Sequence, residues 1–186
     1  MAKTILITGG CRSGKSAYAQ HRAESLAGSR IYVATCPVTD QEMQARIARH
    51  IEQRARRKWK TVEEQIALAL AIENADGGSV ILVDCLTLWV NNLMYEAEKR
   101  GDRFDEVDIE AECIRVCEVA SEHSGTVIFV TNEVGMGIVP ENAAARRYRD
   151  LAGRCNQTVA AAADEVSLVV AGIPMTIKGE NNGVAS

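Results

Sequence analysis

The sequence predicts an α/β domain built around a mostly parallel β-sheet. Strand-like runs alternate with helical patterns along the chain, which is the order expected of right-handed β–α–β crossovers. The runs are continuously apolar rather than alternating, as in Val80–Val83, so helices should cover both faces of the sheet. A glycine-rich turn follows the first run and leads directly into a helix. Together these observations predict one doubly wound domain over residues 1–180 and a flexible tail at 181–186.

The individual elements follow from the same patterns. Apolar or β-branched runs predict strands at Thr4–Thr8, Arg30–Ala34, Ser79–Asp84, Thr126–Thr131, Val166–Ala171 and Met175–Lys178. Helical patterns lie between them at Ser16–Leu26, Gln41–Arg57, Glu63–Asn74, Leu86–Lys99, Ile109–His123 and Glu141–Ala163. Gly172, Ile173 and Pro174 separate the last two runs and predict a tight turn between antiparallel strands.

The turn after the first run has the phosphate-loop pattern G-x-x-x-x-G-K-[ST]. It is formed by Gly9, Gly10, Cys11, Arg12, Ser13, Gly14, Lys15 and Ser16. Between a strand and a helix, such a turn directs backbone N–H groups at phosphate oxygens; Lys15 can reach the outer phosphates and Ser16 can hold Mg²⁺. We therefore expect the chain to bind a nucleoside triphosphate.

Asp84 closes the buried run Val80–Val83 and has two possible roles. Ligands of parallel α/β sheets bind at the carboxyl ends of the strands, where an acid can reach the Mg²⁺ shell directly or through water. Asp is also favoured as a helix N-cap, here for the segment that begins at Cys85. We expect Ser16 and Asp84 to contact the metal, and the N-cap is the alternative.

The helix predicted at Gln41–Arg57 carries a basic stripe. Arg46, His50 and Arg54 recur every four residues and therefore share one face, with Arg57 close to it. Arginine forks bind phosphate oxygens, and the nearby positive charge disfavours imidazolium, which would keep His50 neutral and nucleophilic. From spacing alone, a solvated basic helix face is the more frequent meaning of such a stripe.

Two further segments have open interpretations. Glu63 is either a first-turn helix residue or an acceptor of hydrogen bonds from a base or ribose. The loop Thr131–Gly137 follows a central strand and is either a wall of the substrate pocket or a plain β–α connection. The chain lacks the N-K-x-D guanine reader and the glycine after Asp84 that a switch GTPase would need, so we do not expect that class.

Composition narrows the class of protein further. With 47% hydrophobic residues, 25% charged residues and a net charge of −4, the 186-residue chain does not suggest general affinity for nucleic acid or anionic membranes. No apolar stretch approaches the roughly 18 residues that span a bilayer, and we expect no signal peptide before the first strand. Six cysteines without C-x-x-C spacing and three histidines offer no zinc site and fit a reducing cytoplasm.

Several segments form a more distinctive set. They are Thr8–Ser16, Tyr32–Thr35, Glu42–His50 with its Arg-Ile-x-x-His pattern, Asp84–Trp89, Thr131–Pro140, Gly153–Gln157 and Ala163–Val166. Together they resemble the bifunctional adenosylcobinamide kinase / adenosylcobinamide-phosphate guanylyltransferases of cobalamin biosynthesis. The resemblance covers residues 4 to about 178, and Asn132–Pro140 together with the histidine pattern is its most specific part.

This resemblance implies a two-activity enzyme with a RecA-like P-loop fold. One activity phosphorylates the aminopropanol hydroxyl of adenosylcobinamide with ATP or GTP. The other transfers GMP from GTP, through a guanylylated histidine that falls on His50, to the new phosphate, giving adenosylcobinamide-GDP. The implied nucleotide contacts are the phosphate loop together with Ala34, Thr35, Cys36, Ile51, Glu52, Gln53, Arg54, Glu63 and Asp84. The implied assembly is a homotrimer with sites near subunit contacts.

Four basic residues are expected to lie near the phosphates, and two simpler functions are alternatives. Lys15, Arg46, Arg49 and Arg54 are candidates for neutralising phosphate charge in both transition states. A simpler small-molecule P-loop kinase would use no covalent intermediate, and its His50 helix would be only an anion-binding lid. A nucleotide-binding module would hold GTP without turnover.

Overall fold

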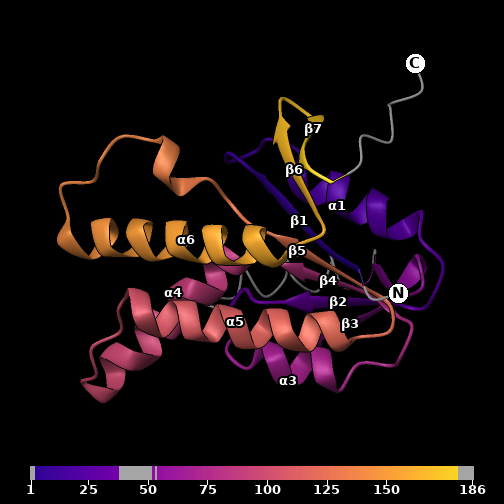
Figure 1. Cartoon of the computed structure of the whole chain (residues 1–186), viewed down its shortest axis with the longest axis horizontal. Coiled ribbons are helices and arrows are strands. Elements are labelled where there is room, and N and C mark those ends of the chain that lie inside the picture. Colours follow the sequence, from indigo (N-terminus) through magenta and orange to yellow (C-terminus); the bar gives the residue numbers. More distant parts are fainter. Residues whose placement is uncertain (1–2, 38–51, 53, 180–186) are drawn as a thin grey trace.

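A seven-stranded sheet forms the centre of the part of the chain that the structure describes (Figure 1). The structure is a computed structural model, and it describes residues 3–37, 52 and 54–179. The strands follow the order β3-β2-β4-β5-β1-β6-β7, and each neighbouring pair is parallel except β6–β7. Their bounds are β1 Lys3–Gly9, β2 Arg30–Ala34, β3 Trp59–Glu63, β4 Val80–Asp84, β5 Thr126–Val130, β6 Glu165–Val170 and β7 Ile173–Lys178. The predicted mostly parallel sheet with an antiparallel end is confirmed.

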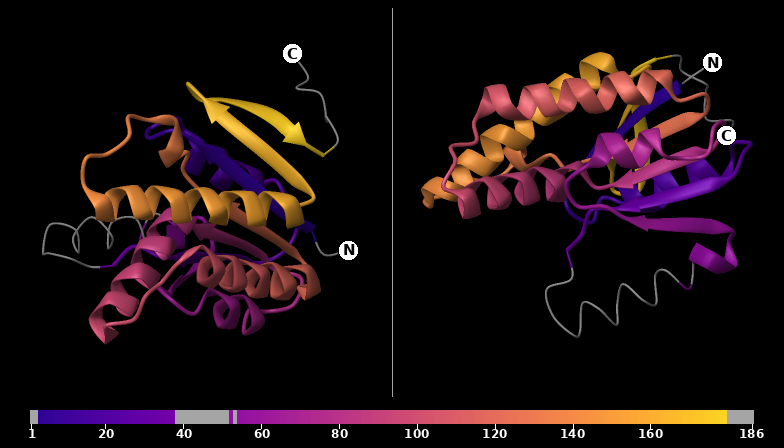
Figure 2. Two further views of the ribbon diagram at one scale, coloured as in Figure 1. Left: turned by 60° about the vertical axis from the view of Figure 1, so that its left-hand side comes forward. Right: turned by 90° about the horizontal axis from the view of Figure 1, so that it is seen from below.

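Helices cover both faces of this sheet. They are α1 Lys15–Glu24, α3 Leu68–Glu73, α4 Leu86–Arg100, α5 Glu106–Glu122 and α6 Ala143–Ala162, with a short 3₁₀ turn, η1, at Val134–Met136. Ile5 and Ile7 of β1 pack in the cluster that contains α1, whereas Leu6 packs in the larger cluster formed with α3 to α6. Since successive side chains of a strand point to opposite faces, both sides of β1 are apolar and buried. Helices α4, α5 and α6 lie together over one face (Figure 2).

Strand β3 corrects one prediction. The segment Glu63–Asn74 was expected to be a helix, but Glu63 is the last residue of β3 and α3 begins only at Leu68. Trp59 is the only buried side chain of β3. It lies edge-on to Tyr32 at 6.2 Å and donates to Oε1 of Glu24 at 3.1 Å. An edge strand of this kind does not show the apolar run by which buried strands are recognised.

The β6–β7 turn lies one position earlier than expected. Ala171 and Gly172 form it, with φ angles of 51° and 83°, and Ile173 and Pro174 already pair with β6. Two successive left-handed residues make the turn that matches the twist of an antiparallel pair. Pro174 is tolerated because β7 is an edge strand.

The remaining expectations have simple outcomes. The helix predicted at Gln41–Arg57 lies mostly outside the described residues; within it, Glu52 and Arg54–Arg56 are helical. The predicted tail at 181–186 also lies outside them. None of the six cysteines forms a disulfide within the described chain. Among the described residues, no helix is both long and apolar enough to cross a membrane.

Candidate active site

The phosphate loop occupies the connection between β1 and α1. Gly9 ends the strand, Lys15 begins the helix, and Gly14 between them has a left-handed φ of 95°. Ser13 N donates to the carbonyl of Gly10 at 3.2 Å, and Tyr18 N donates to that of Gly14 at 3.0 Å. The eight predicted residues from Gly9 to Ser16 therefore form one strand–turn–helix unit, and their contact with nucleotide stays a prediction.

The β6–β7 hairpin supports this loop from behind. Gly172 N donates to the carbonyl of Ser13 at 2.8 Å. A Cβ on Gly14 would lie 3.1 Å from Cα of Gly172, and one on Gly9 would lie 2.5 Å from the carbonyl oxygen of Val169. The loop thus requires glycine because another backbone passes close to it. The buried Ser13 hydroxyl has no hydrogen-bond partner within the described chain.

Lys15 and Asp84 both lie near Cys85 at the carboxyl edge of the sheet. Nζ of Lys15 donates to the carbonyl of Gly10 at 3.1 Å, so the side chain lies across the loop. Burial raises the pKa of the Cys85 thiol, the charge of Asp84 raises it further, and the charge of Lys15 partly opposes them. Both charged groups are therefore close to Cys85.

Register places Asp84 level with Ile7, two residues before the phosphate loop begins at Gly9. Asp84 pairs with Val130 of β5, and Val130 pairs with Ile7 of β1. Because adjacent strands are about 4.8 Å apart, Asp84 lies about 10 Å from Ile7 across the sheet. The N-cap alternative for Asp84 is wrong: Cys85 occupies the N-cap position of α4. Oδ2 of Asp84 instead accepts a hydrogen bond from the Tyr32 hydroxyl at 3.0 Å.

Ala34, Thr35 and Cys36 lie at the same edge. Ala34 is level with both Asp84 and Glu63 across β4-β2-β3. The fully buried Thr35 hydroxyl donates to the Cys85 carbonyl at 2.9 Å and accepts from the Cys85 N–H at 2.7 Å. Its side chain therefore holds the turn after β4. Cys36 is half-buried, and Glu63 is exposed at the end of the edge strand.

The structure describes only part of the segment that was predicted as the basic helix. His50, Arg46, Arg49, Ile51 and Gln53 lie outside the described residues. The guanidinium carbon of Arg54 lies 3.7 Å from the centre of the Tyr32 ring, so Arg54 reaches the residue that holds Asp84. Glu52 forms an exposed ion pair with Arg56 at 2.7 Å, and Arg57 pairs with Glu24 at 3.5 Å. Arg54 is thus the described member of the stripe that lies beside the site.

The loop after β5 contacts the phosphate loop. Oε1 of Glu133 accepts a hydrogen bond from the Thr8 hydroxyl at 2.5 Å, and Glu133 N donates to the carbonyl of Gly9 at 3.2 Å. Asn156 of α6 donates to the same carboxylate oxygen at 3.3 Å. The loop is therefore more than a plain connection. Tyr32 and Asn156 were not predicted as site residues, and Glu133 was predicted only as part of the Thr131–Gly137 loop, because only the strand pairing brings these side chains to the phosphate loop and to Asp84.

The sequence and the fold can be compared with known proteins. A family model described as "Cobinamide kinase / cobinamide phosphate guanyltransferase" matches residues 5–177. The chain is 44% identical over 184 residues to the bifunctional adenosylcobalamin biosynthesis protein CobU of Escherichia coli strain K12, covering 94% of this chain and 99% of that protein. It is 43% identical over 178 residues to CobP of Pseudomonas aeruginosa, which bears the same description, covering 94% and 97%.

Solved structures resemble the fold at low sequence identity. The flagellar accessory protein FlaH from Methanocaldococcus jannaschii matches with a TM-score of 0.53 and 14% identity, covering 96% of this chain and 79% of that chain. The KaiC-like protein PH0186 from Pyrococcus horikoshii matches with a TM-score of 0.50 and 15% identity, covering 90% and 70%. These likenesses support the P-loop NTPase fold alone.

Proposed function

The chain belongs to the cobinamide kinase / cobinamide phosphate guanyltransferase family, and from that premise we propose that it catalyses both reactions. It phosphorylates the aminopropanol hydroxyl of adenosylcobinamide with ATP or GTP. It then transfers GMP from GTP to the new phosphate, giving adenosylcobinamide-GDP. The observation that carries this proposal is the match over nearly the whole length of two bifunctional relatives, together with a phosphate loop that begins two residues after Ile7, which is level with Asp84.

The kinase half uses the phosphate loop. Backbone N–H groups of Gly9–Ser16 surround the phosphates, and Lys15 exchanges its bond to the Gly10 carbonyl for the outer phosphate oxygens. Mg²⁺ fits the hard oxygen donors of Ser16 and Asp84, and when bound it would neutralise phosphate charge. Within the described chain, no group of three or more His, Cys, Asp or Glu side chains could hold a metal.

The guanylyltransferase half uses His50 as the nucleophile. A neutral imidazole nitrogen bonds to the α-phosphorus of GTP as the α–β bridging bond breaks and pyrophosphate leaves. An oxygen of adenosylcobinamide phosphate then bonds to that phosphorus, and the N–P bond breaks to restore the imidazole. Arg54 follows His50 by four residues in the chain and contacts Tyr32, the residue that donates to Asp84. This contact supports the proposal that His50 acts near Asp84.

Labelling with GTP carrying a radioactive α-phosphate tests the histidine. We expect wild-type protein with GTP and Mg²⁺ to acquire an acid-labile, base-stable label on His50, and His50→Ala to remain unlabelled. His21→Ala is the matched control, because His21 is exposed on α1, and it should label like wild type. A wild-type protein that turns over γ-phosphate but never takes up the label would reduce the function to that of a simple kinase.

A second variant tests the phosphate loop. Lys15→Ala removes the loop's lysine and should lower the kinase kcat by about 10²-fold or more. Lys60→Ala on the exposed side of β3 serves as the control of equal charge change. Equal turnover of Lys15→Ala and wild type would remove Lys15 from the mechanism.

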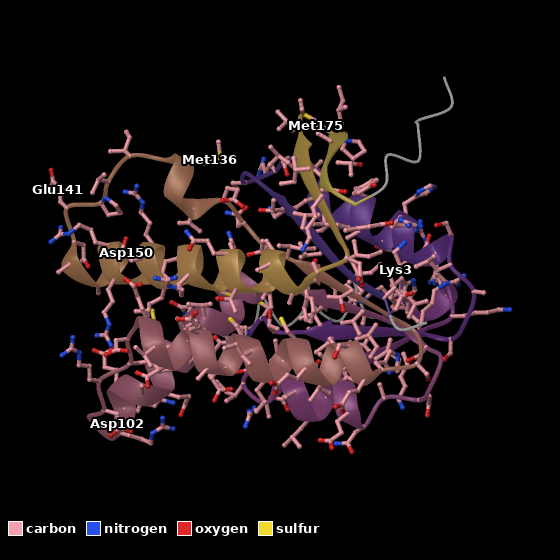
Figure 3. All side chains as sticks on the ribbon, in the orientation of Figure 1. Lys3, Asp102, Met136, Glu141, Asp150 and Met175 are labelled. Carbon is pink, nitrogen blue, oxygen red and sulfur yellow. The ribbon has the colours of Figure 1, made fainter. Side chains whose placement is uncertain are left out.

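Assembly and compartment complete the proposal. We infer a homotrimer in the cytoplasm, which the family resemblance and six cysteines without a disulfide in the described chain support. Side chains more than half exposed on the β6–β7 hairpin, at the end of η1 and after it offer apolar surface for association: Val170, Ile173, Met175, Ile177, Met136, Ile138 and Val139. Met136 and Met175 lie on the same side of the molecule (Figure 3). Sedimentation equilibrium should give three times the 20.2 kDa chain mass; a monomer mass contradicts the assembly.

A further inference from the structure

A polar network joins the phosphate-loop strand to α6 through Glu133. The Thr8 hydroxyl and the Asn156 amide donate to the same carboxylate oxygen, Oε1, at 2.5 and 3.3 Å. The backbone N–H of Glu133 donates to the Gly9 carbonyl at 3.2 Å. Main chain and side chain of Glu133 are therefore both fixed against the first residues of the loop.

The two oxygens of this carboxylate differ in their surroundings. Oε1 accepts both hydrogen bonds, whereas Oε2 makes no hydrogen bond or ion pair with any residue that the structure describes. Glu133 is half-buried, so Oε2 is accessible from solvent-filled space. One oxygen orients the group, and the other is available to a ligand.

Asn156 also fixes the backbone that carries Glu133. Its Oδ1 accepts from the Thr131 hydroxyl at 2.6 Å, and its Nδ2 donates to the carbonyl of Asn132 at 3.2 Å. The Asn132 side-chain oxygen is buried with no hydrogen-bond partner in the described chain, a further polar group that a ligand could satisfy. A loop held by three side-chain contacts positions its carboxylate within narrow limits.

Three other acids at this edge are less suited to the role. Asp84, whose Oδ2 accepts from Tyr32, is assigned to Mg²⁺, and Oε1 of Glu64 accepts from the backbone N–H groups of Ile66 and Ala67 at 2.8 Å. Glu63 ends β3, at the opposite edge of the sheet from the phosphate loop's side. Strand β5 lies between β1 and β4, so Glu133 follows the strand that separates the phosphate loop from Asp84.

We propose that Glu133 is the catalytic carboxylate of the kinase reaction, an inference that rests on the proposed function. Oε2 accepts the proton of the acceptor hydroxyl as its oxygen bonds to the γ-phosphorus. The bond from that phosphorus to the β–γ bridging oxygen breaks, and the nucleoside diphosphate leaves with the electron pair. Thr8 and Asn156 are positioning residues, because they act through Oε1.

Glu133→Gln tests the base directly. The amide oxygen can still accept from Thr8 and Asn156, but the amide nitrogen that replaces Oε2 cannot accept a proton. We expect the kinase kcat to fall by about 10²- to 10⁴-fold. Nucleotide affinity should not change, and neither should GMP transfer to chemically supplied adenosylcobinamide phosphate. Glu141→Gln, an exposed residue of the same connection, is the matched control.

Asn156→Ala tests the positioning role. It should lower the kinase kcat by about tenfold in wild type but have no further effect in Glu133→Gln, because residues that act as a unit are not additive. A wild-type kinase rate in Glu133→Gln, or an equal loss of both activities, overturns the inference and leaves the proposed function intact. If Glu133→Gln does not bind nucleotide, Glu133→Asp decides: an intermediate kinase rate with normal GMP transfer supports the assignment, and equal losses reject it. A wild-type protein without kinase activity refutes the proposed function instead.

Discussion

The Tyr32 hydroxyl donates to Oδ2 of Asp84 at 3.0 Å, while the Arg54 guanidinium lies 3.7 Å from the centre of the same ring. Burial raises the pKa of Tyr32, and the Asp84 charge raises it further, so the hydroxyl stays protonated and keeps donating. A residue of β2 therefore orients the carboxylate of β4 that we assign to Mg²⁺. The same residue contacts Arg54, in the described part of the segment predicted as the basic helix.

Replacing Tyr32 by Phe should weaken metal binding selectively. The ring that stacks on Arg54 remains, but Asp84 loses the donor that orients it. We expect the Mg²⁺ concentration that half-saturates nucleotide binding to rise by about tenfold, as measured by calorimetry. Tyr95→Phe is the control, since Tyr95 is exposed on α4 and also lies beside a cation, Lys99. Superimposable Mg²⁺ titrations for Tyr32→Phe and wild type would contradict the positioning role.

Gly14→Ala should destabilise the phosphate loop. Gly14 has a left-handed φ of 95°, and its new Cβ would lie 3.1 Å from the Gly172 backbone. We expect a loss of about 1–3 kcal/mol in the free energy of unfolding, seen in denaturant titrations without nucleotide. Gly153→Ala within α6 is the control, because no atom lies within 4 Å of its Cβ position and φ is not left-handed. It should be neutral or slightly stabilising.

Thr35→Val keeps the shape of a buried side chain but removes its hydroxyl. The N–H and C=O groups of Cys85 would then lose their bonds of 2.7 and 2.9 Å to Thr35. Leaving buried polar groups unpaired costs about 1–3 kcal/mol, so Tm should fall by about 3–10 °C. Thr158→Val, which removes only a bond to the Arg154 carbonyl on α6, should change Tm far less. Equal Tm values for Thr35→Val and Thr158→Val would argue against a stabilising role of the hydrogen bonds between Thr35 and Cys85.

Glu165 should make stability depend on acid pH. Burial raises the pKa of its carboxyl, but the hydrogen bond and charge of Lys3, with a smaller effect of Arg22, outweigh burial and lower it below 4.5. A carboxyl with a lowered folded-state pKa stabilises the fold above its unfolded pKa and loses that contribution as pH falls through the folded value.

The test compares wild type with Glu165→Gln by denaturant unfolding across pH. Wild type should be more stable by about 1 kcal/mol at neutral pH, and the difference should disappear below the folded-state pKa. Lys3→Met removes the principal partner of Glu165. It should reduce the pH-dependent part of the stability difference between the proteins with Glu165 and with the substitution Glu165→Gln. A difference that stays constant into strong acid would show that the ion pair is not its source.

Burial on both faces explains which strands could be predicted. The runs that became β1, β4 and β5 are mainly apolar or β-branched because helices cover both of their sides. Strand β3 has no such run, and Trp59 is buried only through tertiary contacts with Glu24 and Tyr32. Those contacts depend on the pairing of β3 with β2, which local sequence does not encode.

The residues of the candidate site likewise fall into two groups: those that a local motif identifies and those that only strand pairing brings into position. Its phosphate loop is a local motif, so spacing alone identifies Gly9–Ser16. Glu133 gains its position from the pairing of β1 with β5, and Tyr32 gains its position from the pairing of β2 with β4. Their neighbours in the sequence give no indication of Thr8 or Asp84.

The position of β1 within the sheet also determines the stage of chain synthesis at which the site can form. Among the described strands, β1 pairs only with β5 and β6, and Thr8 bonds to a residue 125 positions later in the chain. During synthesis, the N-terminal loop sequence therefore leaves the ribosome long before any of its supports. Such distant pairings form slowly and late. Bound nucleotide can therefore stabilise the fold only after β5 and β6 have emerged, and a nascent chain without these strands lacks that stabilisation.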